Sequence, residues 1–191
     1  MDRTDMNEIL IRDARAEDFP QIAGIYRSHV LTSSATFEET PPDAEEMAKR
    51  HQAIRASGHF WLCAELDGTL IGYAYATQHK ARSAYRFTAE DSIYLAPEFK
   101  GKGVGTRLLG TVIDRAAELG FREMLAVIGD SENAGSIGLH RKLGFRHVGT
   151  ACGIGWKFRR PIDVVYMQRR LSTPHSEDRV SDTNTNAMMW R

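Results

Sequence analysis

The spacing of apolar positions along the chain predicts an alternation of strands and helices. Residues 9–15 have the alternating composition of a first strand. Asp43 is an N-cap candidate followed by acidic residues, so one helix is expected to begin there and to end at Gly58. An earlier helix is expected between these two elements, because apolar side chains recur there at helical spacing. They are Phe19, Ile22, Ala23, Tyr26 and Val30.

The middle of the chain has the signals of a hairpin, then a strand, a glycine-rich loop and a helix. Two β-rich runs flank Asp67-Gly68, a dipeptide that favours a two-residue hairpin turn. The stretch TAEDSIYLA predicts a further strand, which Pro97 ends before the glycines begin. One apolar face of a helix follows, and Gly120 stops it. This face comprises Val104, Leu108, Val112, Ile113 and Ala116.

The last part of the chain adds a strand, EMLAVIG, a short helix closed by Gly144, and two final strands around a loop. The order is βααββ(loop)βαβαββ, in which an antiparallel meander leads into a βαβ unit. This order predicts an α/β (α+β) fold with a mixed central sheet and helices on its faces. Residues 9–171 form the expected domain. Residues 1–8 are expected to be flexible, and the polar residues 172–191 to be a disordered tail.

Composition narrows the class of protein. Apolar residues make up 42% and charged residues 26% of the 191 residues, which is typical of one globular domain. The 25 Lys and Arg balance the 25 Asp and Glu, which argues against nucleic acid or a membrane as partner. No apolar run reaches the ~18–20 residues of a membrane span. The start MDRTDMNEIL lacks the apolar centre of a signal peptide, and the two cysteines form no CxxC pair, so a cytoplasmic protein is expected.

The glycine-rich segment EFKGKGVGTRLL is the first candidate for chemistry. It is not a Walker A loop, because Gly103 follows Gly101-Lys102 where that motif needs Ser or Thr. It is not a dinucleotide fingerprint, because neither Gly101 nor Gly103 begins a complete G-x-G-x-x-G. The segment opens directly into a helix, whose free amides and dipole favour a bound anion. Lys100 and Lys102 add positive charge to this anion site.

Together with NAGSIGLHRKLGF further along, SIYLAPEFKGKGVGTRLL resembles the GNAT family of acetyl-CoA-dependent N-acetyltransferases. The family's loop pattern is Arg/Gln-x-x-Gly-x-Gly/Ala. Here Lys100-x-x-Gly103-x-Gly105 has Lys in place of the usual Arg or Gln. The resemblance covers residues 9–171. It implies the GNAT fold, in which a mixed, mostly antiparallel central sheet is splayed around the cofactor and has helices on both faces.

The resemblance implies that acetyl-CoA binds at this loop as a co-substrate. The amides of the loop would hold the pyrophosphate, and the pantetheine arm would pair with the preceding strand like an added strand. The amide of Leu95 would stabilise the oxyanion that forms at the thioester. The cofactor-binding residues that the resemblance implies are Ile93, Tyr94, Leu95, Lys100, Gly101, Lys102, Gly103, Val104, Gly105, Thr106, Asn133 and Ser136.

The stretch KARSAYRFTAEDSIYL, with FEETPP and GWKF, is similar to the family branch that acetylates phosphinothricin and methionine sulfone. This branch carries T-V-E-[HDN]-S-[VI]-Y-[VI], which corresponds here to Thr88 through Leu95. The similarity implies a homodimer and a small amino-acid-like substrate, such as phosphinothricin, methionine sulfone or methionine sulfoximine. It implies that Lys157 reaches the substrate across the dimer interface. The expected substrate-binding residues are Phe37, Lys80, Arg82, Tyr85, Glu90, Asp91, Ser92 and Lys157.

Three residues are candidates for catalysis: Glu90, Leu95 and His140. Glu90 is the expected general base, because only a neutral amine attacks a thioester and a carboxylate can take its proton. The resemblance implies that Leu95 would supply the oxyanion amide. Many family members have Tyr at the position of His140, where it protonates the departing thiolate. An imidazole can donate to the sulfur as well, although a thiolate of pKa ~8.5 is a tolerable leaving group unaided.

Other functions remain open at this point. A GNAT enzyme can act instead on a protein N-terminus, a lysine or a polyamine. The chain can also be a non-catalytic acetyl-CoA-binding module, against which the presence of Glu90 argues. A nucleotide hydrolase is disfavoured because the Walker Ser or Thr is missing. No metal is expected, because no histidines have ligand spacing.

Overall fold

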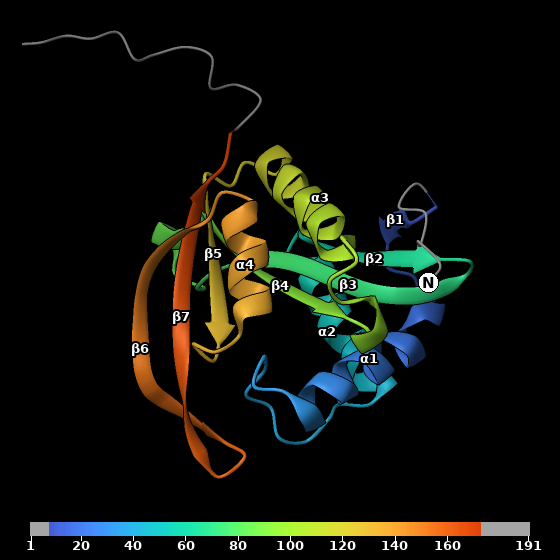
Figure 1. Ribbon diagram of the computed structural model, residues 1–191. Coiled ribbons are helices and arrows are strands. Elements are labelled where there is room, and N and C mark those ends of the chain that lie inside the picture. Colours follow the sequence, from blue (N-terminus) through green and yellow to red (C-terminus); the bar gives the residue numbers. More distant parts are fainter. Residues whose placement is uncertain (1–7, 173–191) are drawn as a thin grey trace, which may run out of the picture.

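The computed structural model describes residues 8–172, so the expected flexible segments 1–8 and 172–191 lie almost wholly outside the described residues. Within this range a seven-stranded mixed sheet is covered by four α-helices, which confirms the α/β fold (Figure 1). The strands are β1 (Leu10–Asp13), β2 (Phe60–Leu66), β3 (Thr69–Gln78), β4 (Thr88–Leu95), β5 (Glu123–Gly129), β6 (Arg146–Lys157) and β7 (Arg160–Arg170). The α-helices are α1 (Phe19–Thr32), α2 (Ala44–Ala56), α3 (Val104–Glu118) and α4 (Ala134–Lys142).

The described sheet is antiparallel except at one junction. Its strand order is β1-β2-β3-β4-β5-β7-β6, and β4 runs parallel to β5. The register between these two strands ends at Asp91↔Ala126, beyond which they separate (Figure 1). Because β4 continues to Leu95 and β5 to Gly129, a gap opens between their carboxyl ends. The splayed sheet that the resemblance implied is therefore present.

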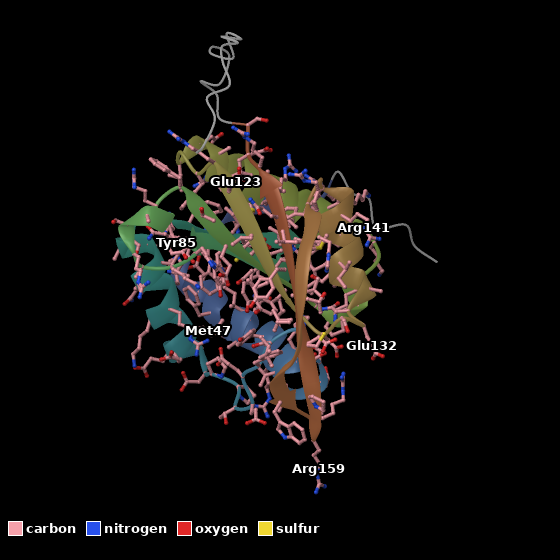
Figure 2. All side chains as sticks on the ribbon, turned by 90° about the vertical axis from the view of Figure 1, so that its left-hand side faces the viewer. Met47, Tyr85, Glu123, Glu132, Arg141 and Arg159 are labelled. Atoms are coloured by element: carbon pink, nitrogen blue, oxygen red, sulfur yellow. The ribbon has the colours of Figure 1, made fainter. Side chains whose placement is uncertain are left out.

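Tight turns join two of the antiparallel pairs. At the β2–β3 turn, Asp67 and Gly68 have φ of 50° and 76°, as a type I′ turn requires and as the dipeptide predicted. At the β6–β7 turn, Phe158 and Arg159 have φ of 52° and 62° although neither is glycine. The loop expected between the last two strands is reduced to this turn. Arg159 lies at the tip of a hairpin that extends past the rest of the sheet (Figure 2).

Helices cover both faces of the sheet, as expected. α3 buries the predicted apolar side against one face, to which β2 contributes Phe60 and Leu62. Trp61 and Cys63, which alternate with these residues along β2, point to the opposite face and pack with α1 and α2. β1 is shorter than the predicted residues 9–15, because a short 3₁₀ helix, Ala16–Asp18, follows it. None of the helices in residues 8–172 has the length and apolar character needed to cross a membrane.

An aromatic layer lies under α1 and α2. The ring of Trp61 stacks on that of Tyr73 with centroids 5.3 Å apart, and Tyr73 lies 5.2 Å from Tyr94 of β4. Tyr26 of α1 meets Tyr94 edge-on at 4.9 Å. These rings join the middle of the sheet to α1, and so fix β4 just beyond the point where it leaves β5.

Candidate active site

The gap between β4 and β5 presents backbone groups of β4. The amide of Ala96 donates to the carbonyl of Ile71 in β3 at 3.0 Å. Because hydrogen-bonding directions alternate along a strand, the amides of Ile93 and Leu95 point away from β3, toward the side that β5 has left. An extended molecule that enters the gap meets donors there, as a neighbouring strand would.

The glycine loop follows β4 and leads into α3. Gly101 and Gly103 have φ of 75° and 86°, in the left-handed region that disfavours side chains. Gly103 is the N-cap of α3, and the amides of Thr106 and Arg107 donate to its carbonyl at 3.0 and 3.3 Å. The amides of residues 101–105 precede the helical hydrogen bonds, and they are the donors that a helix N-terminus offers to an anion.

A cavity of about 700 Å³ joins the gap to the glycine loop. β4 from Asp91 to Leu95, the end of β5, the loop and α4 line it. Its shape and donors fit a long molecule with an anionic end. The predicted cofactor residues in its lining are Ile93, Tyr94, Leu95, Lys100, Gly101, Gly103, Gly105, Thr106, Asn133 and Ser136. The lining does not include Lys102, whose amine lies over the Phe99 ring, or Val104, which is buried in the core.

Asn133 ties α4 to the end of β5. Its Oδ1 accepts a hydrogen bond from the amide of Ser136 at 3.2 Å, and its Nδ2 donates to the carbonyl of Gly129 at 3.3 Å. The side chain therefore caps α4. Close packing also holds α4 against α3, because a Cβ at Gly105 would lie 3.1 Å from Leu139. The wall of the cavity opposite β4 is thus held in place by side chains that also line it.

His140 and Asp91 form a buried pair on the cavity side of β4. His140 Nδ1 donates to the carbonyl of Ser136 at 2.8 Å, and its Nε2 lies 3.1 Å from Oδ2 of Asp91. Both side chains are 2% exposed. Burial lowers the pKa of His140, but the hydrogen bond and charge of Asp91 outweigh burial and raise this pKa above its ordinary value. Both ring nitrogens of His140 therefore face acceptor atoms. The cationic imidazolium satisfies both contacts, because it carries a hydrogen on each nitrogen.

His29 of α1, which the sequence analysis did not single out, lies against the end of β4. Its Nε2 donates to the carbonyl of Leu95 at 2.9 Å. Burial lowers the pKa of His29, so its ring is neutral at physiological pH. The contact fixes the backbone of Leu95, whose amide is the predicted oxyanion donor.

The predicted substrate residues of β4 are divided between its two faces. Glu90 and Ser92 share the α1/α2 face with Tyr94, because side chains alternate along a strand. Asp91 points to the α3/α4 face together with Ile93. The structure therefore brings Glu90 and Ser92 together and separates them from Asp91.

Glu90 is bound by a histidine that the sequence analysis left without a role. Its Oε2 accepts a hydrogen bond from Nδ1 of His79 at 2.6 Å. The ring of Tyr85 meets the imidazole edge-on, with centroids 5.6 Å apart, and the amine of Lys80 lies 5.7 Å from the centre of the Tyr85 ring. Arg82 is exposed in the same loop, which Figure 2 shows at the edge of the molecule around Tyr85. The predicted base thus lies beside the predicted basic loop.

The loop between α1 and α2 is anchored on the C-terminal hairpin. A Cβ at Gly155 would lie 2.2 Å from the ring of Phe37, so only glycine leaves room for this ring. Lys157 is 2% exposed, and its amine donates to the carbonyls of Ser33 and Thr36 at 2.9 and 2.7 Å. Burial lowers the pKa of this amine. Lys157 was expected to reach a partner's site, but its amine is bound to the loop of its own chain.

A second anchor of this loop was not found from the sequence. Asp130, at the end of β5, has φ of 75° and accepts hydrogen bonds from Ser34 Oγ at 2.7 Å and from the guanidinium of Arg160. No spacing signal marks such a residue, because its partners are remote in sequence. In the described part of the chain, no three His, Cys, Asp or Glu side chains gather as a metal site.

Comparison with known proteins agrees with this geometry. Residues 22–145 match the model of the acetyltransferase (GNAT) family. Over 162 residues the chain is 49% identical to the phosphinothricin N-acetyltransferase of Alcaligenes faecalis. The aligned region covers 85% of this chain and 82% of the relative. Over 167 residues it is 38% identical to the L-methionine sulfoximine/L-methionine sulfone acetyltransferase of Pseudomonas paraeruginosa, with coverage of 87% and 96%.

A solved structure extends the agreement to the fold. The GNAT superfamily phosphinothricin acetyltransferase from Sinorhizobium meliloti, in complex with acetyl-CoA, has a TM-score of 0.84 at 44% identity, and covers 91% of this chain and 95% of that one. Acetyl-CoA is a long molecule with an anionic end, of the kind that the cavity between β4 and β5 fits. On the sequence match and the shared fold, the chain belongs to the GNAT family of N-acetyltransferases.

Proposed function

We propose that the protein transfers the acetyl group of acetyl-CoA directly to the α-amino group of a small amino acid of the phosphinothricin, methionine sulfone or methionine sulfoximine type. One observation carries the proposal: two different surfaces meet at β4. In the gap between β4 and β5 a backbone-lined cavity ends at an anion-binding loop, and on the α1/α2 face of β4 a partly exposed carboxylate lies beside a basic loop. The activities named for the relatives from Alcaligenes and Pseudomonas support the choice of substrate.

On the cavity side, backbone groups would do most of the binding. The amides of residues 101–105 hold the pyrophosphate of acetyl-CoA, and Lys100 adds charge to them. The amide of Ile93 pairs with the pantetheine arm. The amide of Leu95, fixed by the contact of its carbonyl with His29, donates to the thioester oxygen as that oxygen gains negative charge.

On the opposite side, side chains would bind and activate the amine. Glu90 takes a proton from the substrate ammonium group, the freed lone pair attacks the thioester carbon, and the C–S bond breaks. Lys80 and Arg82 attract the carboxylate and polar head of the substrate, and Phe37 and Tyr85 contact its aliphatic part. Ser92 borders the same face as Glu90. The role of Lys157 is to hold the loop that carries Phe37.

Both ring nitrogens of His140 are engaged, so it is not free to protonate the departing thiolate. To donate a proton, His140 must first break its contact with Ser136 or Asp91. A thiolate of pKa ~8.5 leaves without a proton at neutral pH. Because the charges of the imidazolium and of Asp91 cancel, we expect the pair to have a small effect on the negative charge that develops on the sulfur.

A thiol-release screen with acetyl-CoA tests the proposed reaction. Phosphinothricin, methionine sulfone and methionine sulfoximine are compared with spermidine and with short peptides that have free N-termini. Release of coenzyme A with the small amino acids, and product masses that match their N-acetyl forms, are expected. Preference for peptides or for spermidine would contradict the substrate class. Binding of acetyl-CoA without turnover of any amine would indicate a binding module instead.

We also propose that the protein is a homodimer that pairs through β6. This strand lies at the edge of the sheet, and its large apolar side chains are uncovered: Ile154 is 62% exposed and Trp156 67%. Apolar surface on an edge strand favours association. Light scattering is expected to give the mass of two chains, and of one chain for Trp156→Glu. A monomeric wild-type protein with full activity would exclude the dimer.

We infer a cytoplasmic location for this enzyme. Cys63 is buried and Cys152 exposed, and both are free thiols. Unpaired thiols are typical of a reducing compartment, where acetyl-CoA is also consumed by enzymes of this family. Fractionation of cells with an antibody against the protein tests this location, and recovery from an extracytoplasmic fraction would contradict it.

A further inference from the structure

The contact between Glu90 and His79 lies on the acceptor face of the sheet. Glu90 pairs with Thr77 in the β3–β4 register, and His79 lies two residues beyond Thr77 on the same face. The side chain of His79 is 14% exposed and that of Glu90 34%. The 2.6 Å separation between Nδ1 and Oε2 is short for a nitrogen–oxygen hydrogen bond, as is typical when one partner is charged. The pair is therefore an ordered feature of a surface that substrate must reach.

We propose that His79 is a positioning residue for the general base. An ionised carboxylate is only an acceptor, so Nδ1 of His79 carries the hydrogen of the bond. Because His79 engages Oε2, the carboxylate cannot rotate freely, and Oε1 is the oxygen that receives the proton of the substrate ammonium. His79 itself takes no proton from the substrate. This inference rests on the role of Glu90 in the proposed function.

The surroundings of His79 support an oriented ring. Its backbone amide donates to the carbonyl of Thr88 at 2.9 Å, which extends the β3–β4 ladder past the end of β3. The ring of Tyr85 then packs edge-on against the imidazole. Backbone and side chain are thus both held, so the direction of the Nδ1 hydrogen is set before substrate arrives. Preorganised donors of this kind are effective because they need not reorient during the reaction.

A purely structural role makes a different prediction. If the imidazole serves only as a surface for Tyr85 and the basic loop, His79→Phe keeps the ring and should keep activity. If the bond to Glu90 matters, His79→Phe lowers kcat for the amine by about tenfold, which corresponds to the loss of one hydrogen bond to a charged group. His79→Asn should restore most of this loss, because its amide nitrogen lies near the position of Nδ1. His79→Gln places the amide farther out and should not.

The experiment is a double-mutant cycle measured with the full chain, acetyl-CoA and the best amine from the screen. Glu90→Gln alone should lower kcat by ~10²–10⁴-fold while acetyl-CoA affinity is retained. His79→Phe added to Glu90→Gln should cost little more, because no carboxylate base is left to position. Protection of each variant by acetyl-CoA against thermal unfolding shows that it is folded. If His79→Phe does not fold, the comparison of His79→Asn with His79→Gln replaces it.

The outcomes separate the two proposals. If Glu90→Gln has wild-type kcat and KM, the base assignment fails and this inference fails with it. If Glu90→Gln is impaired but His79→Phe is as active as the wild type, or if the two losses multiply, His79 does not act through Glu90. The inference is then overturned and the role of Glu90 stands. A loss in His79→Phe that disappears in the Glu90→Gln background, with rescue by Asn and not by Gln, supports it.

Discussion

The two sides of β4 would recognise their ligands in different ways under the proposed function. In the proposed function, the donors offered to acetyl-CoA are backbone amides, which belong to the edge of β4 that faces the gap and to the glycine loop. On the α1/α2 face, the groups that would bind the amine are side chains, among them Glu90 and Ser92, and several are held by residues from other elements. Adjacent residues of β4 point to these two sides, because Asp91 faces the cavity and Glu90 faces away from it.

This difference determines how the function of each side responds to amino-acid substitutions. A backbone site depends on conformation, so it is sensitive to glycines and insensitive to most side-chain replacements. A side-chain site depends on the contacts that hold each group, such as the bonds from Lys157 to Ser33 and Thr36. Variants that affect one side and leave the other intact therefore test this difference.

The largest effect is expected for Gly103→Glu. This position has φ of 86°, and a carboxylate here would lie at the anion site. Loss of two charge-assisted hydrogen bonds to the pyrophosphate weakens acetyl-CoA binding by about 100-fold or more. Isothermal titration calorimetry measures the change.

Gly58→Glu is the matched control, since Gly58 also has positive φ, 78°, with open space around it. It carries the same backbone strain and charge away from the cavity. It should lose stability and keep acetyl-CoA affinity. Equal loss of affinity in both variants would mean that strain, and not the phosphate site, is responsible.

A smaller effect, on the acceptor face, is expected for Lys157→Met. The substitution leaves the carbonyls of Ser33 and Thr36 without their buried donor, which costs ~2–4 kcal/mol of unfolding free energy. The loop that carries Phe37 loosens, so KM for the amine rises while acetyl-CoA affinity is kept. Urea denaturation and steady-state kinetics measure these changes. Lys49→Met, at an exposed position on α2, should change stability by less than ~0.5 kcal/mol. An unchanged amine KM in Lys157→Met would separate the loop from the substrate site.

The smallest effect concerns the buried pair in the cavity. The pKa of His140 is raised in the folded state, since the contact with Asp91 outweighs burial. A raised folded-state pKa contributes stability below the unfolded pKa of ~6.5, and this contribution is lost as pH rises through the folded value. The stability advantage of the wild type over His140→Gln should therefore be larger at pH 6 than at pH 9. Urea titrations at both values measure it, and an advantage that grows with pH would contradict the charged pair.

The same contrast explains what the sequence predicted. The hairpin at Asp67-Gly68 and the helix that starts after Gly103 were expected, because each depends on residues that are close in sequence. The splayed strands were expected only from the family resemblance, since β4 and β5 are distant in sequence. The glycine loop is also local in sequence, and ten of the twelve residues predicted to bind the cofactor line the cavity, whereas Lys102 and Val104 do not.

The acceptor side was predicted less well, because its contacts join distant parts of the chain. The burial of Lys157 depends on a loop far earlier in the chain, since Ser33, which accepts one of its hydrogen bonds, is 124 residues away in sequence. The separation of Asp91 from Glu90 requires the face of each residue along β4 to be known. His79 has no motif around it, and only the register of β3 with β4 brings it to Glu90. Neither the composition nor the residue spacing of the sequence predicts these contacts and side-chain directions.

Residue-resolved amide hydrogen exchange tests most directly the claim that backbone amides of β4 and the glycine loop hold acetyl-CoA. Exchange is measured by NMR with and without saturating acetyl-CoA, with ATP as the control ligand. We predict that acetyl-CoA slows exchange at Ile93, at Leu95 and in residues 101–105, that ATP does not protect the strand amides, and that residues 80–87 change little. Unchanged exchange in residues 101–105, or protection confined to residues 80–87, would contradict it.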